Sequence, residues 1–350
     1  METTTPVCAI IPPHILDKLA QSDDPVVYEP ARRTLEHDAA LRTQRRVAST
    51  RGNDTPGGTP SDKPQRTVYD AGHQDRTPGT KVHAESDQPS KDQTVNRAHD
   101  GLGATFDFYL KVYGRRSIDG SGLPLDATVH YGDKYGNALW DGERVVLGDG
   151  FGDLFLDFTL ALDVIAHELT HGVIQHTANL ENYGQSGALN ESVSDVFGSL
   201  VKQYALGQTA DQADWLIGND MLGPGFPGTA LRSLKAPGTA YDDDLLGKDP
   251  QPASMDHYVR TPRDNGGVHI NSGIPNHAFY QLATTLGGHA WERAGHIWYA
   301  TLTGGELASD ASFADFARLT VASARSLYGD DGEEIQALLK AWSTVGVPAT

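Results

Sequence analysis

The sequence predicts an α+β protein in which a β-rich N-terminal lobe and an α-helical C-terminal lobe flank a central helix. Short runs that suit strands, broken by Gly-rich turns, gather between residues 66 and 147. Beyond residue 188, apolar residues recur mostly at helical spacing. Between the two parts, residues 162–173 combine helical periodicity with the pattern His-Glu-x-x-His. A chain of 350 residues exceeds a usual single core, so two lobes and an extra segment are expected.

The first 47 residues are expected to form a unit that is too small to hold a core alone. Ile15, Leu16 and Leu19 make an apolar cluster, and Pro30 suits the start of a charged helix. Residues 48–65 have the composition of a linker. The expected division is therefore 1–47, a linker at 48–65, an N-terminal lobe at 66–187 with the central helix, and a C-terminal lobe at 188–350.

Local spacing predicts the elements within each lobe. The N-terminal lobe should hold strands between Arg66 and Val82, a helix from Asp92 to Tyr113, and strands at 127–131 and 143–147. In the C-terminal lobe, a helix should open at Glu191, and later helices should cover 275–285, 291–303, 313–328 and 333–342. A cleft between the lobes would have the central helix at its floor.

Composition excludes several classes of protein. The net charge is −18, and the whole acidic excess lies beyond residue 51, which argues against nucleic-acid and membrane partners. No run approaches the roughly 18 apolar residues of a membrane span. The N-terminus lacks the basic region of a signal peptide, so we expect cytoplasmic synthesis, with non-classical secretion as an alternative. Cys8 is the only cysteine, which excludes an intrachain disulfide.

The central helix carries the pattern of a metal site. His167 and His171 stand at positions i and i+4, so both imidazoles can face one ion. A pair of solvated surface histidines is the alternative, but the apolar positions on another face of the helix favour a buried one. Glu191 follows in a second helical pattern and supplies a carboxylate. Two imidazoles, one carboxylate and water form an open zinc site, and Glu168 lies where a general base is needed.

Other residues would support these ligands. Metal-bound histidines usually donate their second N–H to a carboxylate or carbonyl group. Asp195 lies one turn after Glu191 and is the candidate partner of His167, while a solvated acid is the alternative. Asn190 is placed in the same supporting role.

Four stretches, residues 137–140, 167–171, 187–195 and 264–273, resemble the thermolysin family of neutral zinc metallopeptidases. The resemblance covers about residues 66–350, and residues 10–16 are similar to the short propeptide of the protealysin-like subgroup. It implies a two-lobe fold and a zinc endopeptidase that cuts before bulky hydrophobic residues. It also implies a precursor that processes itself. The implied partners are protein or peptide substrates and its own propeptide, with a protein inhibitor as a further candidate.

The resemblance also implies individual roles. His269 would bind the oxyanion, with Asp264 orienting it. Asn137 and Ala138 would bind the peptide backbone, and Arg232 would hold a substrate carbonyl. An apolar pocket would bind the substrate residue that follows the cleaved bond. Its lining would be Phe155, Phe158, Val164 and Leu231, and the alternative for each of them is ordinary core packing. The alternative is a catalytically inactive zinc protein that binds peptides in the cleft, which the presence of a general base disfavours.

The sequence departs from the family at two positions. Tyr183 stands one residue later than the usual second oxyanion donor, at whose place Asn182 is found. Asp163 matches a family calcium ligand, but Lys202 replaces an expected acidic partner and would oppose a bound cation. We therefore expect no double calcium site, which leaves room for one weaker site.

The first 47 residues suggest how activity is controlled. We expect them to cover the cleft and to be removed by cleavage, first at Arg46–Val47, because Val47 is the only bulky apolar residue between Arg42 and Val68. Cys8 could bind the zinc ion of the precursor as a thiolate. Its ordinary alternative is a small buried apolar residue.

Overall fold

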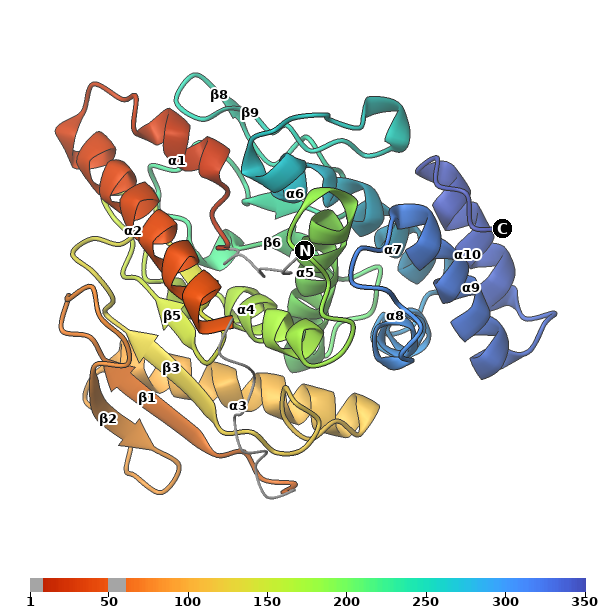
Figure 1. Ribbon diagram of the computed structural model, residues 1–350, viewed down its shortest axis with the longest axis horizontal. Coiled ribbons are helices and arrows are strands. Elements are labelled where there is room, and N and C mark those ends of the chain that lie inside the picture. Colours follow the sequence, from red (N-terminus) through yellow and green to blue (C-terminus); the bar gives the residue numbers. More distant parts are fainter. Residues whose placement is uncertain (1–8, 50–60) are drawn as a thin grey trace.

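The structure is a computed structural model that describes residues 9–49 and 61–350, with only the backbone of 42–49. It confirms the α+β class and the two-lobe arrangement (Figure 1). Cys8 and the side chain of Val47 lie outside the described residues, so the predictions made for them stay predictions.

The N-terminal lobe is built on a five-stranded mixed sheet with the order β2-β1-β3-β5-β4. The strands are β1 (Arg66–Asp70), β2 (Thr80–Ala84), β3 (Leu125–Val129), β4 (Ala138–Trp140) and β5 (Val145–Leu147). β1, β3 and β5 run parallel, while β2 and β4 are antiparallel strands at the two edges. Helix α3 (Gln93–Tyr113) begins at Asp92, whose carboxylate caps the N–H of Thr94. The family resemblance implied a strand edge at Asn137 and Ala138, but local spacing did not predict β4, because three residues are too few to show alternation.

Two helices form the centre of the molecule, α4 (Leu162–Gln175) and α5 (Gly184–Leu206) (Figure 1). α4 is buried from Asp163 to Ile174, as its apolar periodicity predicted. α5 begins at Gly184, well before Glu191, so the predicted start is wrong. Glycine and serine in its first turns are weak helix formers and hid the beginning. The expected lobe boundary at 187/188 falls inside this helix.

The C-terminal lobe is helical only in its later part. Its helices are α6 (Asp264–Asn271), α7 (Gly273–Leu286), α8 (Arg293–Thr303), α9 (Phe313–Tyr328) and α10 (Glu333–Thr344). Residues 207–263 were expected to be mostly helical and instead hold short elements and loops. These elements are β6 (Leu216–Ile217), η2 (Asn219–Met221), β7 (Arg232–Ser233), β8 (Asp242–Asp243), β9 (Gly247–Lys248) and η3 (Met255–His257). The many glycines and prolines of this stretch account for the difference.

The N-terminal segment forms two helices, α1 (Pro13–Leu19) and α2 (Pro25–Ser49), which lie on the left of Figure 1, with α2 running from the outer edge toward α4. Ile15, Leu16 and Leu19 are fully buried in the main core, so this unit docks on the body as expected. The predicted start of the second helix was wrong. Pro25 is its first residue, where a missing N–H costs nothing, and Pro30 lies inside the helix.

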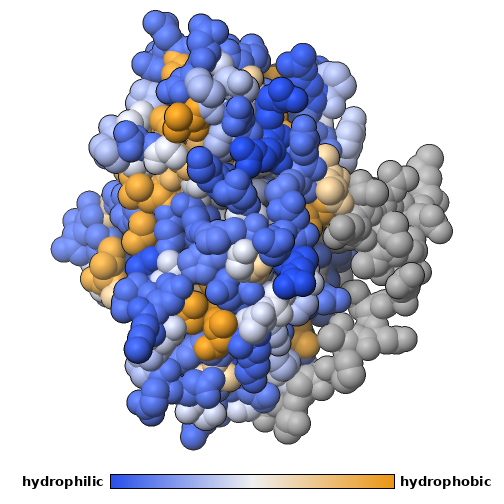
Figure 2. All heavy atoms as spheres, turned by 90° about the vertical axis from the view of Figure 1, so that its left-hand side faces the viewer, coloured by the Kyte–Doolittle hydropathy of each residue, from blue (hydrophilic) through white to orange (hydrophobic). Residues whose placement is uncertain are grey.

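The outer surface agrees with the acidic, polar composition. On the face drawn in Figure 2, hydrophilic residues predominate and hydrophobic ones form small separate patches. The described part of the chain contains no helix that could span a membrane. A 3₁₀ helix, η1 (Phe158–Leu160), leads into α4 and completes the elements that position the centre.

α4 and α5 approach closely at Gly198. A Cβ atom there would lie 2.6 Å from the carbonyl oxygen of Asp163 and 3.4 Å from the Cβ atom of His167. Gly198→Ala should therefore push the helices apart, lower the free energy of unfolding by about 1–3 kcal/mol and weaken zinc binding. Denaturant unfolding and zinc titration check this, with the exposed Leu206→Ala on the same helix as control. Unchanged zinc affinity in Gly198→Ala would contradict the expected coupling.

Candidate active site

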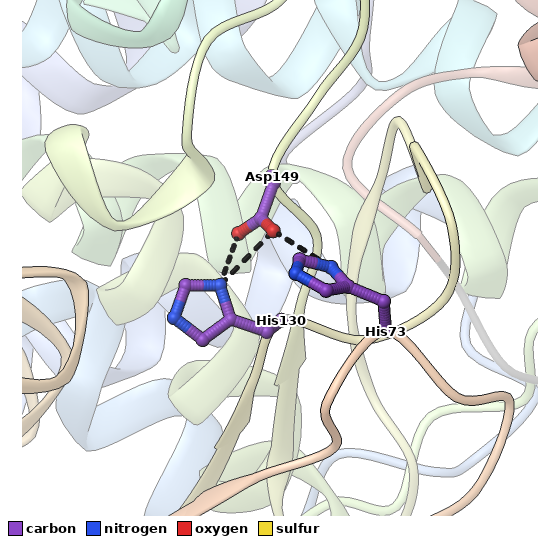
Figure 3. A group of neighbouring side chains, drawn as sticks. All are labelled: His73, His130 and Asp149. Atoms are coloured by element: carbon purple, nitrogen blue, oxygen red, sulfur yellow. Dashed lines mark hydrogen bonds and ion pairs between the residues drawn. The ribbon is translucent and has the colours of Figure 1, made fainter.

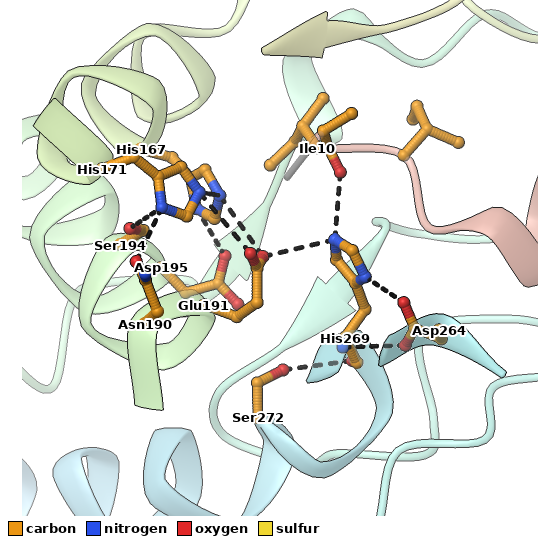
Figure 4. A network of polar contacts seen from close by, with 12 residues as sticks. Ile10, His167, His171, Asn190, Glu191, Ser194, Asp195, Asp264, His269 and Ser272 are labelled. Atoms are coloured by element: carbon orange, nitrogen blue, oxygen red, sulfur yellow. Dashed lines mark hydrogen bonds and ion pairs between the residues drawn. The ribbon is translucent and has the colours of Figure 1, made fainter. Parts of the chain in front are cut away.

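Three buried side chains converge between α4 and α5 (Figure 4). The Nε2 atoms of His167 and His171 lie 3.0 Å apart. Each of these nitrogens lies 3.6 Å from an oxygen of the Glu191 carboxylate. The structure thus brings together the three residues that the sequence predicted as metal ligands.

The polar partners of the two Nδ1 atoms determine whether each Nε2 carries a proton or a lone pair. Nδ1 of His167 lies 2.9 Å from Oδ1 of Asp195, and Nδ1 of His171 lies 2.9 Å from Oδ1 of Asn190. Because both oxygens are acceptors, these contacts favour a proton on each Nδ1 and leave each Nε2 with a lone pair. Asp195 and Asn190 therefore lie where the sequence analysis expected supporting groups.

Two lone pairs and a carboxylate that face one another repel unless a cation lies between them. Glu191 is 1 % exposed, and its oxygens accept no hydrogen bond from the described residues. Nitrogens that bind one zinc ion tetrahedrally lie about 3.3 Å apart, close to the 3.0 Å found here. The residues fit a zinc ion, and no cysteine is needed to explain them.

Asp195 links this site to Arg232. The sequence analysis named both residues but did not predict that they pair. Arg232 donates two hydrogen bonds to the Asp195 carboxylate, at 2.9 and 2.8 Å. Asn276 donates a third, at 2.9 Å. Burial disfavours ionisation of Asp195, but Arg232 and His167 outweigh it and hold the pKa of this carboxyl well below its ordinary value.

A tight turn brings His269 to the opposite side of Glu191. Residues 264–267 all have positive φ, and the Asp264 carboxylate accepts both the backbone N–H of His269 and its Nδ1–H. Nε2 of His269 lies 3.4 Å from Glu191. Burial lowers the pKa of His269, but the carboxylates of Asp264 and Glu191 raise it to about 9. His269 can therefore donate a proton from Nε2, as an oxyanion-binding residue must.

The N-terminal segment passes through the site and pairs with β4 through one β-bridge. Ala9 pairs with Leu139 in an antiparallel bridge, and the N–H of Ile10 donates to the carbonyl of Ala138 at 2.9 Å. The carbonyl of Ala9 accepts from Nε2 of His269 at 3.1 Å, and that of Ile10 accepts from Arg232 at 2.9 Å. The segment therefore adds a short strand to the open edge of β4.

Asn137 completes these backbone contacts. Its Oδ1 accepts the N–H of Ile11 at 2.8 Å, and its Nδ2 donates to the carbonyl of Ile11 at 3.3 Å. Nδ2 also donates to the Asp38 carboxylate of α2 at 2.9 Å. The side chain expected to bind a substrate backbone therefore binds the backbone of the N-terminal segment.

The remaining predicted residues are buried or lie near the site, but no contact with the N-terminal segment identifies their roles. The four residues expected to line the apolar pocket are all buried, in the same hydrophobic core as Ile10; they are Phe155, Phe158, Val164 and Leu231. Glu168 is fully buried on α4, beside His167. Tyr183 is 63 % exposed and packs near Gly266, at the turn that carries Asp264 and His269. Its role as an oxyanion donor stays a prediction.

Asp163 lies away from the three zinc ligands and has a cationic partner. The ammonium group of Lys202 is 4.0 Å from Asp163, 3.2 Å from Asp214 and 3.5 Å from Asp220. It also donates to Oδ1 of Asn219 at 2.6 Å. Burial lowers the pKa of Lys202, but the surrounding carboxylates raise it above its ordinary value. A protein cation thus lies where the sequence analysis considered calcium.

Some residues of the site were missed by sequence reasoning. Ser194 lies 3.1 Å from Nδ1 of His171, and Asn276 and Asp38 bond Asp195 and Asn137. Ser194 could have been found, because it lies three residues after Glu191 on the same helix face. The other two come from distant segments, and no local spacing points to them.

Comparison with known proteins agrees with this geometry. Residues 48–175 match the family model described as the thermolysin metallopeptidase catalytic domain, and residues 178–347 match its alpha-helical domain. The chain is 48 % identical to an "Extracellular metalloprotease" of Pectobacterium carotovorum subsp. carotovorum, over 98 % of this chain and 97 % of that protein. It is 44 % identical to an "Extracellular minor metalloprotease" of Serratia marcescens, over 81 % and 79 % of the two.

A solved structure is also similar. It is described as "Precursor of Protealysin, Metalloproteinase from Serratia proteamaculans", and it matches with a TM-score of 0.88 and 48 % identity. The match covers 97 % of this chain and 99 % of that one. The similarity therefore includes the N-terminal helices as well as the two lobes.

These comparisons correct one prediction. We expected cytoplasmic synthesis without a signal peptide, but the relatives from Pectobacterium and Serratia marcescens are named extracellular proteases. The expectation of a cytoplasmic protein is therefore wrong. The pattern of a signal peptide describes only one route of export, so a missing basic region does not predict where a protein acts.

The contacts of Lys202 make a testable prediction. Lys202→Met leaves the buried Asp163 carboxylate without its cation, so the free energy of unfolding should fall by about 3 kcal/mol. Thermal and urea unfolding measure the change. Lys111→Met removes an exposed ion pair with Asp107 and should leave the melting temperature almost unchanged. Equal stability of the Lys202→Met and parent proteins would contradict this role.

Proposed function

The chain belongs to the thermolysin family of metallopeptidases, and on that premise we propose that it is a zinc endopeptidase cutting before bulky hydrophobic residues. The observation that carries the proposal is the convergence of His167, His171 and Glu191 beside an extended peptide segment. A structural zinc site would be closed by protein ligands, whereas three ligands leave one position open for chemistry.

Substrate would bind as an added strand at the edge of β4. Asn137 and Ala138 would accept and donate the backbone hydrogen bonds, and Arg232 would donate to a carbonyl group. The contacts of Ala9, Ile10 and Ile11 with these residues support this arrangement. Binding through the backbone accepts many sequences, which suits an endopeptidase.

The chemistry would then divide among a few side chains. A bound zinc ion supplies a Lewis acid that polarises the scissile carbonyl and lowers the pKa of water. Glu168 would take the proton from the attacking water and pass it to the leaving nitrogen. His269 would donate from Nε2 to the developing oxyanion, with Asp264 holding its ring. Asp195 and Asn190 would fix the tautomers of His167 and His171.

The register of the N-terminal segment suggests which bond is cut. The carbonyl of Ala9 lies on His269, and the next carbonyl, of Ile10, lies on Arg232. We therefore propose that Ala9 occupies the position before the cut and Ile10 the position after it. Ile10 would then occupy the expected apolar pocket of Phe155, Phe158, Val164 and Leu231, which are buried in the same hydrophobic core.

The N-terminal helices would make the chain a latent precursor. We propose that residues 1–47 are the propeptide and that self-processing begins at the Arg46–Val47 bond. The predicted first bond, Arg46–Val47, lies within α2, so the end of this helix would have to unwind before cleavage. We propose no calcium ion at Asp163, because the ammonium group of Lys202 already lies against its carboxylate.

Removal of the general base tests the catalytic assignment. Glu168→Gln should lower kcat for casein by about 10²–10⁴-fold while zinc binding at His167, His171 and Glu191 stays as in the parent protein. Hydrolysis assays and metal analysis measure the two effects. A chelator should abolish activity of the parent enzyme, and zinc should restore it. A parent protein that binds zinc but hydrolyses nothing would instead support a peptide-binding protein.

The role of Ile10 gives a second test. Ile10→Asp places a charge in the apolar site and should weaken the hold of the propeptide. The precursor should then become active at least about tenfold faster than the parent, which corresponds to 1.4 kcal/mol. Val26→Asp, at an exposed position of α2, is the matched control. If both variants mature at the rate of the parent, Ile10 does not maintain latency.

A further inference from the structure

A second group of metal-ligating side chains lies in the N-terminal lobe, apart from the residues of the active site (Figure 3). His73 follows β1, His130 follows β3, and Asp149 follows β5. These three strands are parallel neighbours, so their carboxyl ends meet at one edge of the sheet. Ligands commonly bind at this edge in sheets with parallel strands.

The three side chains point toward one another. Nδ1 of His130 lies 2.9 Å from Oδ1 of Asp149 and 3.0 Å from its Oδ2. Nδ1 of His73 lies 3.3 Å from Oδ2 of the same carboxylate. One ligand atom from each residue falls within 4.8 Å of the others. Two Nδ1 atoms and a carboxylate thus face a common point.

The backbone holds both histidines in place. His73 and His130 have φ of 58° and 51°. This left-handed conformation costs a non-glycine residue about 1 kcal/mol or more of conformational free energy. The N–H of His73 donates to the carbonyl of His130 at 2.9 Å, which clamps the two segments together. Strained residues of this kind gather at functional sites.

Asp92 orients the ring of His130 from behind. One carboxylate oxygen lies 2.9 Å from Nε2 of His130, and the other caps α3 through the N–H of Thr94. A carboxylate on the far nitrogen of a histidine is the usual support of a metal ligand. It keeps a proton on Nε2 and leaves Nδ1 as the nitrogen that can bind an ion.

We propose that His73, His130 and Asp149 form a second metal site, which takes a transition-metal ion of the zinc class. Two imidazoles and one carboxylate suit zinc, copper or nickel, whereas calcium and magnesium require mostly oxygen ligands. The side chain of His73 is 59 % exposed, so water can complete the coordination. The ion would join three loops of the N-terminal lobe and stabilise the folded chain.

A proton competes with this ion. Hydrogen bonds to Asp149 and Asp92 raise the pKa of His130 to about 9, so a metal ion must displace the proton on Nδ1, which leaves to solvent. Without an ion, the same contacts make an imidazolium held between two carboxylates. The experiment must distinguish these two states.

The test is zinc titration of the full chain carrying Glu168→Gln, after its first equivalent has been loaded. Calorimetry should show a second equivalent, and that equivalent should raise the melting temperature. His73→Asn keeps a residue that tolerates the left-handed backbone but lacks the imidazole. It should weaken the second equivalent more than about tenfold and leave the first unchanged.

Two further variants sharpen the result. Asp92→Asn retains the helix cap but not the carboxylate on His130, and should weaken the second equivalent by about 10–100-fold. His257→Ala removes an exposed histidine of η3 and should change nothing. The proposal is overturned if the parent takes one equivalent only, if His73→Asn binds the second equally well, or if His257→Ala weakens it as much.

Discussion

The carboxylate of Asp195 is buried between His167 on one side and Arg232 on the other, and it joins α4 to β7. Without an opposite charge on each side, an ionised group at that depth would be strongly disfavoured. His167 is thereby held with Nε2 toward Glu191, and Arg232 is held as a donor to the carbonyl of Ile10. The proposed metal site and the contact with the N-terminal segment therefore share one electrostatic support.

The packing of the central helices serves the same arrangement. Gly198 lets α5 approach the backbone of α4 at Asp163, one turn before the first histidine ligand. Glu191 and Asp195, one turn apart on α5, can then reach the two rings of α4 together. The small residue Gly198 sets the distance between the two helices. That distance in turn determines which charged groups of α4 and α5 can pair.

Local spacing predicted what lies within one helix or one turn. His167 and His171 on α4, and Glu191 and Asp195 on α5, needed only helical geometry to be found. The pairing of Arg232 with Asp195 could not be derived, because it joins segments far apart in the chain, and the edge strand β4 was implied only by the family resemblance. The roles of His269, Asn137 and Arg232 came from a family resemblance. The start of α5 and the irregular stretch 207–263 were misjudged, since glycine-rich sequence gives little periodicity to read.

The edge of β4 holds the N-terminal segment through Asn137, Ala138 and Arg232. If the same three residues also bind the substrate, a substitution at this edge changes both the latency of the precursor and the activity of the enzyme. A substitution that weakens binding of the N-terminal segment at this edge would also weaken binding of the substrate. Natural variation that changes latency alone should then accumulate in α2, where Asp38 contacts Asn137 but belongs to the segment that the proposed processing would remove.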